Sequence, residues 1–429
     1  MATRGSREGS RPGRAAARLY GVAAVIGAVA ALAGCGSSGT GAVALNWYVF
    51  PEPSGSFAAA AAACSAASHG AYKINITFNS TSSDQQRVNL VRRLAANDSS
   101  IDILAMDVDW TAEFAGAKWI KPVPAALAAQ IRSEDLAGPV RTASINGQLW
   151  GVPINSNTEL LWYRKDLVPT PPTTWSQMIA DSIELARQGK PHYIEEQGAE
   201  YEGLTVWFNS LVDSAGGQIL GPNDAVALNS TAKSAALIMR SLATTAAADP
   251  SLNVTMEGQS DVAFDAGTAA FEINYPFVWD SAQKANPAVA KDMAWAPFPR
   301  VTPDLPARVS IGGYNLGVSS HSAHSDLAFK AVQCLTQPAN QTTYAIKGGL
   351  APVSSSIYSV PSFQKAYPFW SLIKQQLTTY GLRPQTPAYA DVTLAIQKAL
   401  SPTSSINPST VVNTLRNEIK ASLSSSALL

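Results

Sequence analysis

Apolar and polar positions alternate in a regular order along the chain from residue 42 onward. Short apolar stretches predict strands, and segments with apolar positions three or four residues apart predict helices. In the first part of the chain this pattern predicts strands over 42–50, 72–78 and 101–106 and helices over 57–68 and 84–96. Strands that alternate with helices favour a parallel sheet covered by helices. Ligands of such sheets bind beyond the carboxyl ends of the strands, and Asp107 directly follows the third predicted strand.

The same alternation continues from residue 160 to residue 336. Here the pattern predicts helices over 174–187, 202–214, 231–244 and 327–336, and strands over 160–163, 269–274, 292–298 and 312–319. We find no nucleotide-binding glycine loop, no HExxH motif, no GxSxG motif and no internal repeat of fixed period. The pattern therefore predicts an α/β protein, and its length allows two domains with large cores.

The N-terminal residues have the pattern of a bacterial lipoprotein signal peptide, residues 1–34. Arginines precede an apolar stretch over 19–32, which is short for a membrane span. The stretch ends in Leu32-Ala33-Gly34-Cys35, and small residues before a cysteine suit cleavage by a signal peptidase. Cleavage would leave the thiol of Cys35 to carry lipid at the start of a flexible tether, residues 35–42. The alternative is an uncleaved anchor helix with an incidental cysteine.

The charge balance excludes one class of partner. The full chain has 31 basic and 31 acidic residues, and removal of the signal makes the net charge slightly negative. No cluster of lysine or arginine remains to attract nucleic acid. No later apolar stretch reaches the length of a membrane span, about 18 residues. We therefore expect a mature protein on the extracytoplasmic face of the cell membrane, anchored by lipid.

Two further cysteines, Cys64 and Cys334, each lie in a predicted helix. Outside the cytoplasm an even number of cysteines favours a disulfide bond. This bond requires the two helices to pack side by side. The alternative is a pair of separately buried thiols. The spacing of the four histidines relative to the cysteines disfavours a zinc site.

Several segments resemble a known family. Residues 152–167, VPINSNTELLWYRKDL, resemble the crossover between the lobes of the extracellular sugar-binding proteins of ABC importers, the maltose-binding class. Within this class, four further segments resemble the trehalose-binding lipoproteins of actinobacteria. These segments are 107–115, 202–209, 311–316 and 383–387. The resemblance covers nearly all of the mature chain in the same order.

The resemblance implies a two-lobe, hinged, periplasmic-binding-protein-like α/β fold with the ligand cleft between the lobes. The chain would cross between lobes near 155–157, 308–312 and 350–352. The first lobe would contain residues 43–155 with 309–350, and the second 157–307 with 352–429. Both Cys64 and Cys334 would then belong to the first lobe, where a disulfide would brace one lobe without blocking the hinge.

The resemblance also implies a set of ligand-binding residues. Carboxylates, amides and guanidinium groups suit sugar hydroxyls because each forms directed or paired hydrogen bonds, and aromatic rings suit the apolar faces of the sugar. The positions that match the family's sugar contacts are Asp107, Asn157, Glu257, Tyr275, Gly349 and Arg383. Tyr275 departs from the family, which has a tryptophan there. The segment after Trp279 is also shorter than in the family, and both departures concern the exact sugar rather than its class.

Each of these residues also has a structural interpretation. Asp107 would cap a helix, and Asn157 would serve as a hinge turn residue. Glu257 would be a solvated surface residue. Arg383 would be a surface charge or part of a salt bridge between domains, and Gly349 would serve a bulge or turn. Three other residues, Tyr201, Glu202 and Trp110, are weaker candidates for the cleft, and Trp110 equally suits a core.

The leading hypothesis is therefore a binding protein without catalysis, cofactor or metal. It would bind an α-linked disaccharide, with trehalose favoured, and deliver it to the membrane permease of an ABC transporter. Monomer is the default state for the class. The first alternative is a lipoprotein glycosidase that uses Asp107 and Glu257 across one glycosidic bond. The second is a binder of another oligosaccharide or solute on the same fold.

Overall fold

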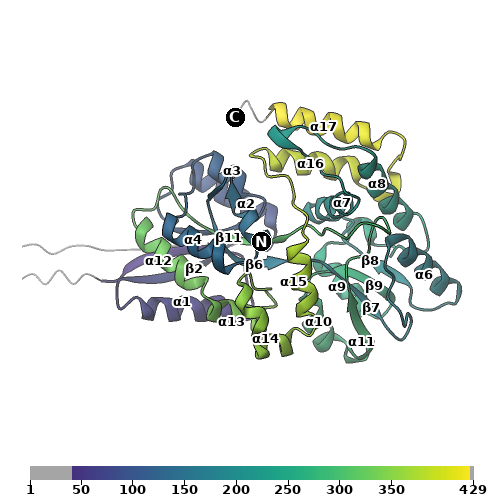
Figure 1. Cartoon of the computed structure of the whole chain (residues 1–429), viewed down its shortest axis with the longest axis horizontal. Helices are drawn as coiled ribbons and strands as arrows, with labels where there is room; N and C mark the ends of the chain where they lie inside the picture. The colour runs from purple at the N-terminus through teal and green to yellow at the C-terminus, as the bar shows by residue number, and fades with distance from the viewer. Residues whose placement is uncertain (1–40, 426–429) are drawn as a thin grey trace, which may run out of the picture. The chain divides into compact units, whose positions relative to one another are not determined.

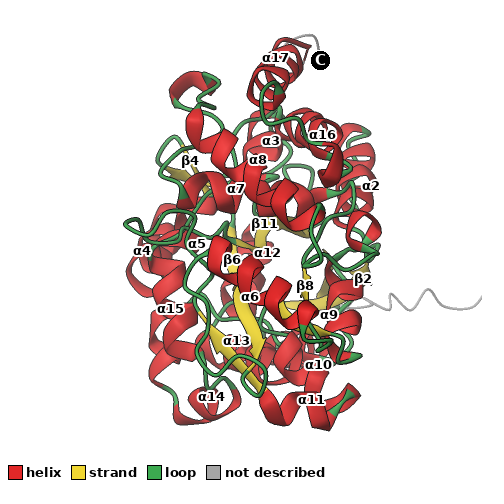
Figure 2. Cartoon of the chain, turned by 90° about the vertical axis from the view of Figure 1, so that its right-hand side faces the viewer, coloured by secondary structure: helices red, strands yellow, loops and turns green. Residues whose placement is uncertain are grey.

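The computed structural model describes residues 41–425, which form one compact unit. The predicted signal peptide, Cys35 and most of the predicted tether lie outside the described residues. Within the described range, no helix is both long and apolar enough to cross a membrane. Seen from the side in Figure 2, the strands lie inside a layer of helices.

The first sheet contains five strands in the order β2-β1-β3-β11-β6. Their bounds are β1 Val43–Val49, β2 Tyr72–Phe78, β3 Ile103–Asp107, β6 Val152–Asn157 and β11 Gly312–Val318. Strand β1 pairs in parallel with β2 and with β3, as the sequence pattern predicts. The sheet then continues with antiparallel pairs, β3 with β11 and β11 with β6. The sheet is therefore mixed, and β11 enters it from a distant part of the sequence.

Both faces of the first sheet are covered by helices. Consecutive side chains of a strand point to opposite faces, and β3 is buried on both. Ile103 and Ala105 belong to one apolar core, whereas Leu104 and Met106 belong to another. The helices around this sheet are α1 Ser56–Ala67, α2 Ser83–Ala95, α3 Thr111–Gly116, α4 Ala125–Glu134, α5 Ala137–Thr142, α12 Ser325–Leu335 and α13 Pro338–Gly348. Of these, α1 to α4 and α12 are seen on the left of Figure 1. A short hairpin, β4 Ser144–Ile145 with β5 Gln148–Leu149, lies between α5 and β6.

A disulfide bond joins Cys64 in α1 to Cys334 in α12. The two Cα atoms are 5.8 Å apart, although the residues are separated by 270 positions in the sequence. The two helices therefore pack side by side against the first sheet, in the arrangement that the disulfide interpretation requires.

The second sheet contains four strands in the order β10-β7-β9-β8. Their bounds are β7 Leu160–Arg164, β8 Tyr193–Glu195, β9 Ala269–Asn274 and β10 Met293–Ala296. Side chains of β7 again alternate between two cores, with Leu161 in one and Trp162 in the other. The helices of this region are α6 Trp175–Arg187, α7 Glu202–Ser214, α8 Ser230–Ala243, α9 Glu257–Asp265, α10 Val278–Ala285 and α11 Pro287–Asp292. All thirteen residues of α7 are buried, so this helix is the centre of its core rather than a cover.

Four helices that the sequence analysis did not assign form the C-terminal part. They are α14 Pro361–Ala366, α15 Trp370–Thr378, α16 Tyr389–Leu400 and α17 Val411–Ser425. Apolar residues of α16 and α17 complete the core around α7, whereas α15 packs into the core that contains Trp162. Figure 1 shows α16 and α17 above α7 and α8, at the yellow end of the colour range.

The three predicted crossings between lobes lie next to one another. Asn157, the last residue of β6, pairs with Gly312 of β11. The peptide N–H of Ser156 donates to the carbonyl of Ala351 at 2.9 Å. Each sheet has an apolar core of its own, and a further core contains both Trp162 of β7 and Ala345 of α13, so it joins the two regions. The residue limits of the two lobes remain a prediction.

Candidate functional site

Asp107 lies at the carboxyl end of β3, where the strand pattern places it. Its Oδ1 accepts a hydrogen bond from the Arg383 guanidinium at 3.0 Å, and its Oδ2 accepts one from the Ser83 hydroxyl at 3.3 Å. The following helix α3 starts after Trp110 and has no side-chain cap. The structure therefore uses Asp107 as an ion-pair partner and not as the helix cap of the structural interpretation.

Arg383 connects the end of strand β3 to the start of helix α7. It lies on the segment between α15 and α16 and is only 6% exposed. Besides Asp107, it donates to Oε1 of Glu202 at 2.7 Å and lies 3.5 Å from Oδ1 of Asp109. Glu202 is the first residue of α7, and its carboxylate also accepts from the Tyr389 hydroxyl. In this structure the guanidinium of Arg383 therefore forms ion pairs with three carboxyl groups.

The carboxyl groups around Arg383 differ in their pKa values. Burial raises the pKa of Asp107, but the Arg383 charge and hydrogen bonds outweigh burial and the pKa lies below its ordinary value. For Asp109, burial dominates over the attraction of Arg383, and its pKa lies well above the ordinary value. Burial likewise raises the pKa of Glu202 against the opposing effect of Arg383. Of the three carboxyl groups, Asp107 is therefore the one whose ionised form the surroundings favour.

Glu257 is the first residue of α9 and is half-buried. Its peptide N–H donates to the Tyr201 hydroxyl at 2.9 Å, and its carbonyl accepts from the Asn274 amide at 3.1 Å. Burial, followed by the negative charges of Asp107 and Asp261, raises the pKa of Glu257 to about 7. Asp107 from the first sheet and Glu257 from the second region are therefore near enough to repel each other.

The amide group of Asn157 and the phenol ring of Tyr275 are two further groups of the candidate site. Tyr275 follows β9 and is 9% exposed, and the charges of Glu257 and Arg383 both act on its hydroxyl. A Cβ atom placed on Gly312 would lie 3.4 Å from Cβ of Asn157 and 3.8 Å from the Tyr275 hydroxyl. Asn157 and Tyr275 therefore approach the same glycine from different elements.

Gly349 ends helix α13 in the left-handed conformation, with φ of 69°. This is the turn role of its structural interpretation, and glycine adopts it without steric cost. A Cβ atom there would lie 3.5 Å from Cβ of Phe277, two residues after Tyr275. Gly349 therefore lies close to the segment that carries Tyr275.

Several residues around this site were not selected from the sequence. They are Asp109, Glu159, Gln197, Tyr314 and Tyr389, whose side chains contact the selected residues or act on them electrostatically. Glu159 lies two residues after Asn157, inside the segment that carries the family resemblance. Its place in this segment is the sequence signal that could have identified Glu159 as a site residue. Of the weaker candidates, Tyr201 and Glu202 lie in the network, whereas Trp110 is a core residue.

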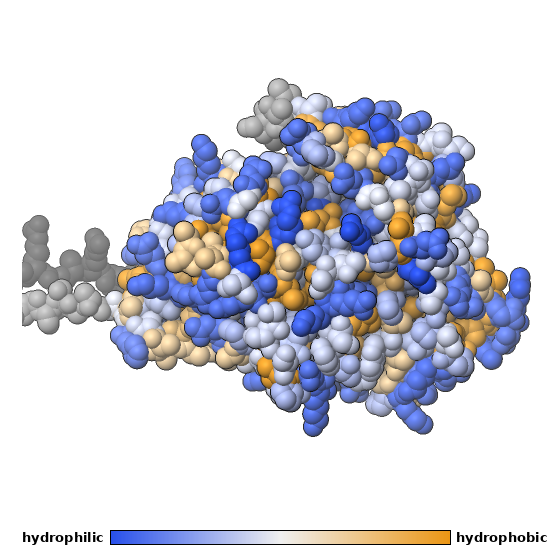
Figure 3. Space-filling model, in the orientation of Figure 1, coloured by the Kyte–Doolittle hydropathy of each residue, from blue (hydrophilic) through white to orange (hydrophobic). Residues whose placement is uncertain are grey.

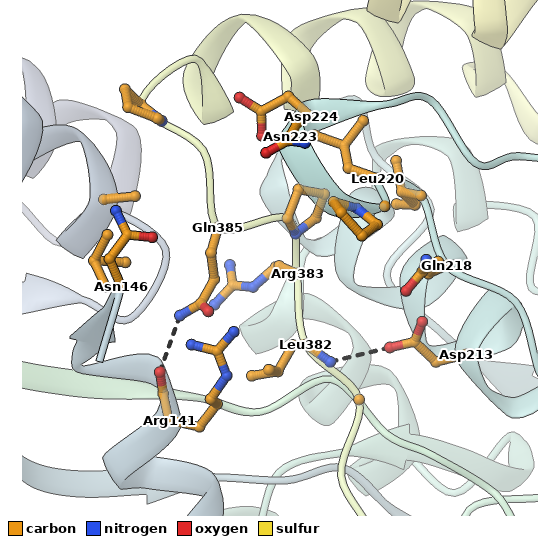
Figure 4. A pocket seen from close by; sticks show the side chains of 18 of the residues that line it. Arg141, Asn146, Asp213, Gln218, Leu220, Asn223, Asp224, Leu382, Arg383 and Gln385 are labelled. Carbon is orange, nitrogen blue, oxygen red and sulfur yellow. Dashed lines mark hydrogen bonds between the residues drawn. The ribbon is translucent and has the colours of Figure 1, made fainter. Parts of the chain in front are cut away.

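A groove of about 970 Å³, lined by both polar and apolar residues, lies beside Arg383. Arg383 is the only one of the selected ligand residues that lines it. Figure 4 shows Arg141 and Asn146 on one side of the groove, Asp213 and Gln218 on the other, and the segment of Arg383 and Gln385 between them. Gln385 donates to the carbonyl of Arg141 at 3.0 Å, and the peptide N–H of Leu382 donates to Asp213 at 3.0 Å. The segment 382–385 thus bridges two regions of the molecule.

Metal binding has no candidate residues in the part of the chain that the structure describes. No group of three or more His, Cys, Asp or Glu side chains is placed there to hold an ion.

The surface in Figure 3 mixes hydrophilic residues with scattered hydrophobic ones. What the site offers chemically is a set of hydrogen-bonding carboxyl, amide, guanidinium and phenol groups.

Known proteins share this sequence pattern and fold. The family described as "Bacterial extracellular solute-binding protein" matches residues 53–342. A protein of Deinococcus radiodurans named "Probable ABC transporter-binding protein" is 27% identical over 312 residues, which cover 69% of this chain and 72% of that protein.

Solved structures agree on the fold. Maltose-bound MalE3 of T. maritima superposes with a TM-score of 0.80 and 24% identity over 89% of this chain and 100% of its own. The GacH receptor of Streptomyces glaucescens superposes with a TM-score of 0.76 and 18% identity over 89% of this chain and 99% of its own. These similarities show the two-lobe α/β fold that the sequence predicts. The chain belongs to the family of bacterial extracellular solute-binding proteins, the binding components of ABC transporters.

Proposed function

We propose that this protein binds an α-linked disaccharide, with trehalose as the first candidate, between its two lobes. It then delivers the sugar to the membrane permease of an ABC transporter. The lipid on Cys35 keeps the protein at the extracytoplasmic face of the membrane. The Gly/Ser-rich tether after this cysteine lets the lobes turn toward the permease.

The main support is the convergence of the family-matched residues. Asp107 and Arg383 are in direct contact, and both act electrostatically on Glu257 or Tyr275. Asn157 approaches Tyr275 across Gly312. Carboxylates and a guanidinium can each bind two neighbouring hydroxyls, and the phenol ring suits an apolar sugar face. Because these groups come from both sheets, a sugar that contacts all of them favours the closed arrangement of the lobes.

Relatives of known structure support the ligand class. One holds maltose and another α-D-tagatose, and the GacH receptor was solved with acarbose. Each of these molecules presents many hydroxyls, which a site of carboxylates and amides satisfies. The choice of trehalose rests on the sequence segments that resemble the trehalose-binding lipoproteins.

Calorimetry on the soluble chain, residues 36–429, tests the proposal. We expect heat of binding with trehalose and weaker or no binding with maltose, sucrose and the β-linked disaccharide cellobiose. Glu257→Gln should weaken trehalose binding by about tenfold to a hundredfold, because it replaces charge-assisted hydrogen bonds with neutral ones. Glu418→Gln, an exposed residue on α17, serves as the matched control and should bind like the parent protein.

Two outcomes would contradict the proposal. Absence of binding to every α-linked disaccharide would exclude the ligand class, and binding that survives Glu257→Gln unchanged would exclude the site. The sugar is recovered and analysed after long incubation. Hydrolysis products would favour the glycosidase alternative, in which Glu257 would act as the acid because its pKa of about 7 lies near neutral pH.

The lipid anchor requires a separate test. Cys35→Ser should move the protein from the membrane fraction to the soluble fraction and leave sugar affinity unchanged. Retention in the membrane fraction would instead indicate an uncleaved anchor helix.

A further inference from the structure

Glu159 is a buried carboxyl group next to the proposed site. It is 1% exposed and lies between β6 and β7, two residues after Asn157. Its Oε1 accepts a hydrogen bond from the Gln197 amide at 3.1 Å, whereas its buried Oε2 has no hydrogen-bond partner among the described residues. Burying an ionised carboxylate without a paired cation is costly, so such a group favours its neutral form.

A short chain of hydrogen bonds connects Glu159 to Glu257. Gln197 donates to Glu159 through its amide nitrogen and accepts from the Tyr201 hydroxyl through its amide oxygen. The Tyr201 oxygen in turn accepts from the peptide N–H of Glu257 at 2.9 Å. The start of α9, which carries Glu257, is therefore hydrogen-bonded to Tyr201, and Tyr201 is connected to Glu159 through Gln197.

The charged and titratable groups that act on Glu159 come from four elements or segments. They are Glu257 of α9, Arg383 of the segment before α16, Glu196 and Tyr201 after β8, and Tyr275 after β9. Burial, followed by the negative charge of Glu257, raises the pKa of Glu159 to about 8, although Arg383 opposes this. Glu159 and Glu257 interact, so they lose their protons in two steps that belong to the pair.

We propose that Glu159 is a positioning residue of the binding site and must keep its proton for the sugar to bind. In this arrangement Glu257 is the ionised acceptor for sugar hydroxyls, and neutral Glu159 supports it through Gln197 and Tyr201. Loss of the second proton would place a buried negative charge beside Glu257, with no added cation to balance it. This inference rests on the proposed sugar-binding function and adds a pH limit to it.

The test is trehalose affinity as a function of pH, measured by calorimetry between pH 7 and pH 9.5. The affinity of the parent protein should fall by about tenfold from its value at pH 7.5 to pH 9, because only about a tenth of the Glu159 side chains would then carry a proton. Glu159→Gln keeps an acceptor for Gln197 and cannot ionise, so its affinity should not change between pH 7.5 and pH 9.

Glu195 provides a matched control. It is also 1% exposed, and its pKa is raised to about 8, but by burial and Asp249 rather than by groups of the site. Glu195→Gln should therefore reproduce the alkaline loss of the parent protein. A parent protein whose affinity does not change up to pH 9 would overturn the inference. So would an alkaline loss that persists in Glu159→Gln or disappears in Glu195→Gln.

A ligand-independent measurement separates this inference from the proposed function. The carboxyl ¹³C resonance of Glu159, assigned by its absence in Glu159→Gln, should titrate in the unliganded protein well above the ordinary range of a glutamate. A midpoint near 4 to 5 would overturn the inference even if trehalose binds. Failure of all disaccharides to bind while this resonance titrates near pH 8 would instead count against the proposed function.

Discussion

A single side chain, Arg383, decides the electrostatics of the candidate site. Its guanidinium contacts Asp107, Asp109 and Glu202, and these carboxyl groups have no other cation in contact among the described residues. Burying a pair of charges costs desolvation free energy, so the net contribution of such a pair to the stability of the fold is often small. Removal of only one partner is different, because the remaining charges stay buried without compensation.

We therefore expect Arg383→Met to lower the free energy of unfolding by about 3 kcal/mol. The measurement is urea denaturation of the soluble chain. The control is Arg187→Met, which breaks a surface pair with Glu184 in which both side chains are more than half exposed. That change should leave the free energy of unfolding nearly unchanged, because solvent screens an exposed pair. Equal costs for the two variants would show that the buried cluster contributes no more than a surface pair.

At the scale of elements, the crossing of β6 and β11 depends on close backbone contact. Gly313 has φ of 115°, a conformation that other residues rarely adopt. A Cβ atom at this position would lie 2.4 Å from the carbonyl oxygen of Asn155 and 2.8 Å from Cα of Ser156. These residues belong to β6, directly before Asn157, so any added atom must push the crossing strands apart.

Gly313→Ala should accordingly destabilise the protein by about 2 kcal/mol or more and weaken sugar binding. Thermal unfolding and calorimetry measure the two effects. Gly258→Ala is the matched control, because a Cβ atom on this residue of α9 meets nothing within 4 Å. In a helix this change should be neutral or stabilising by up to about 1 kcal/mol. Similar behaviour of the two variants would contradict the steric argument.

The sequence predicted where helix α7 lies in the chain, but not that the helix is buried on all sides. Its bounds, Glu202–Ser214, agree with the sequence pattern, yet every residue in it is buried. The polar residues of this helix therefore face other parts of the protein instead of solvent. Asn209 and Ser210 both donate to Ser310 beside the crossing at Gly312, at 2.9 and 3.0 Å, and Glu202 binds Arg383. The helix thereby links the second core to the crossing segments.

At the scale of the whole molecule, several carboxyl groups of the described residues are buried and take part in none of the salt bridges found among those residues. Burial raises the pKa of Glu195 to about 8, that of Asp213 to about 7 and that of Asp261 to about 6. The unfolded chain releases these protons near pH 4, whereas the folded protein keeps them. Between these values the folded state binds more protons, so its stability falls as the pH rises.

We expect the free energy of unfolding to fall by at least about 2 kcal/mol from pH 5 to pH 8. Carboxyls with lowered pKa values, such as Asp107 and Asp166, act in the opposite direction, but their contribution is lost only at lower pH. Urea denaturation at several pH values measures the slope. Glu195→Gln should make the slope less steep between pH 5 and pH 8. Stability that stays constant or rises over this range would show that these groups ionise without penalty.

The sequence by itself determined the local structure and the class of the protein. Apolar periodicity within β1 to β3 and within helices such as α6 and α8 is set by neighbours a few residues away, so a local pattern carries it. The segment 152–167 carried the family resemblance, and the extracytoplasmic signal directed attention to Cys64 and Cys334. The helices beyond residue 336, α13 to α17, were not predicted from the sequence.

The tertiary structure alone decided which distant residues meet. Arg383 is 276 residues from Asp107 and 181 residues from Glu202, and no local pattern records that one guanidinium binds both carboxylates. The antiparallel insertion of β11 beside β3 and the burial of Glu159 near Glu257 are likewise long-range outcomes. The protonation state of a carboxyl depends on its burial and on the charges around it. The sequence could therefore name acidic and basic residues for a sugar site, but only the folded chain determines which of them are charged.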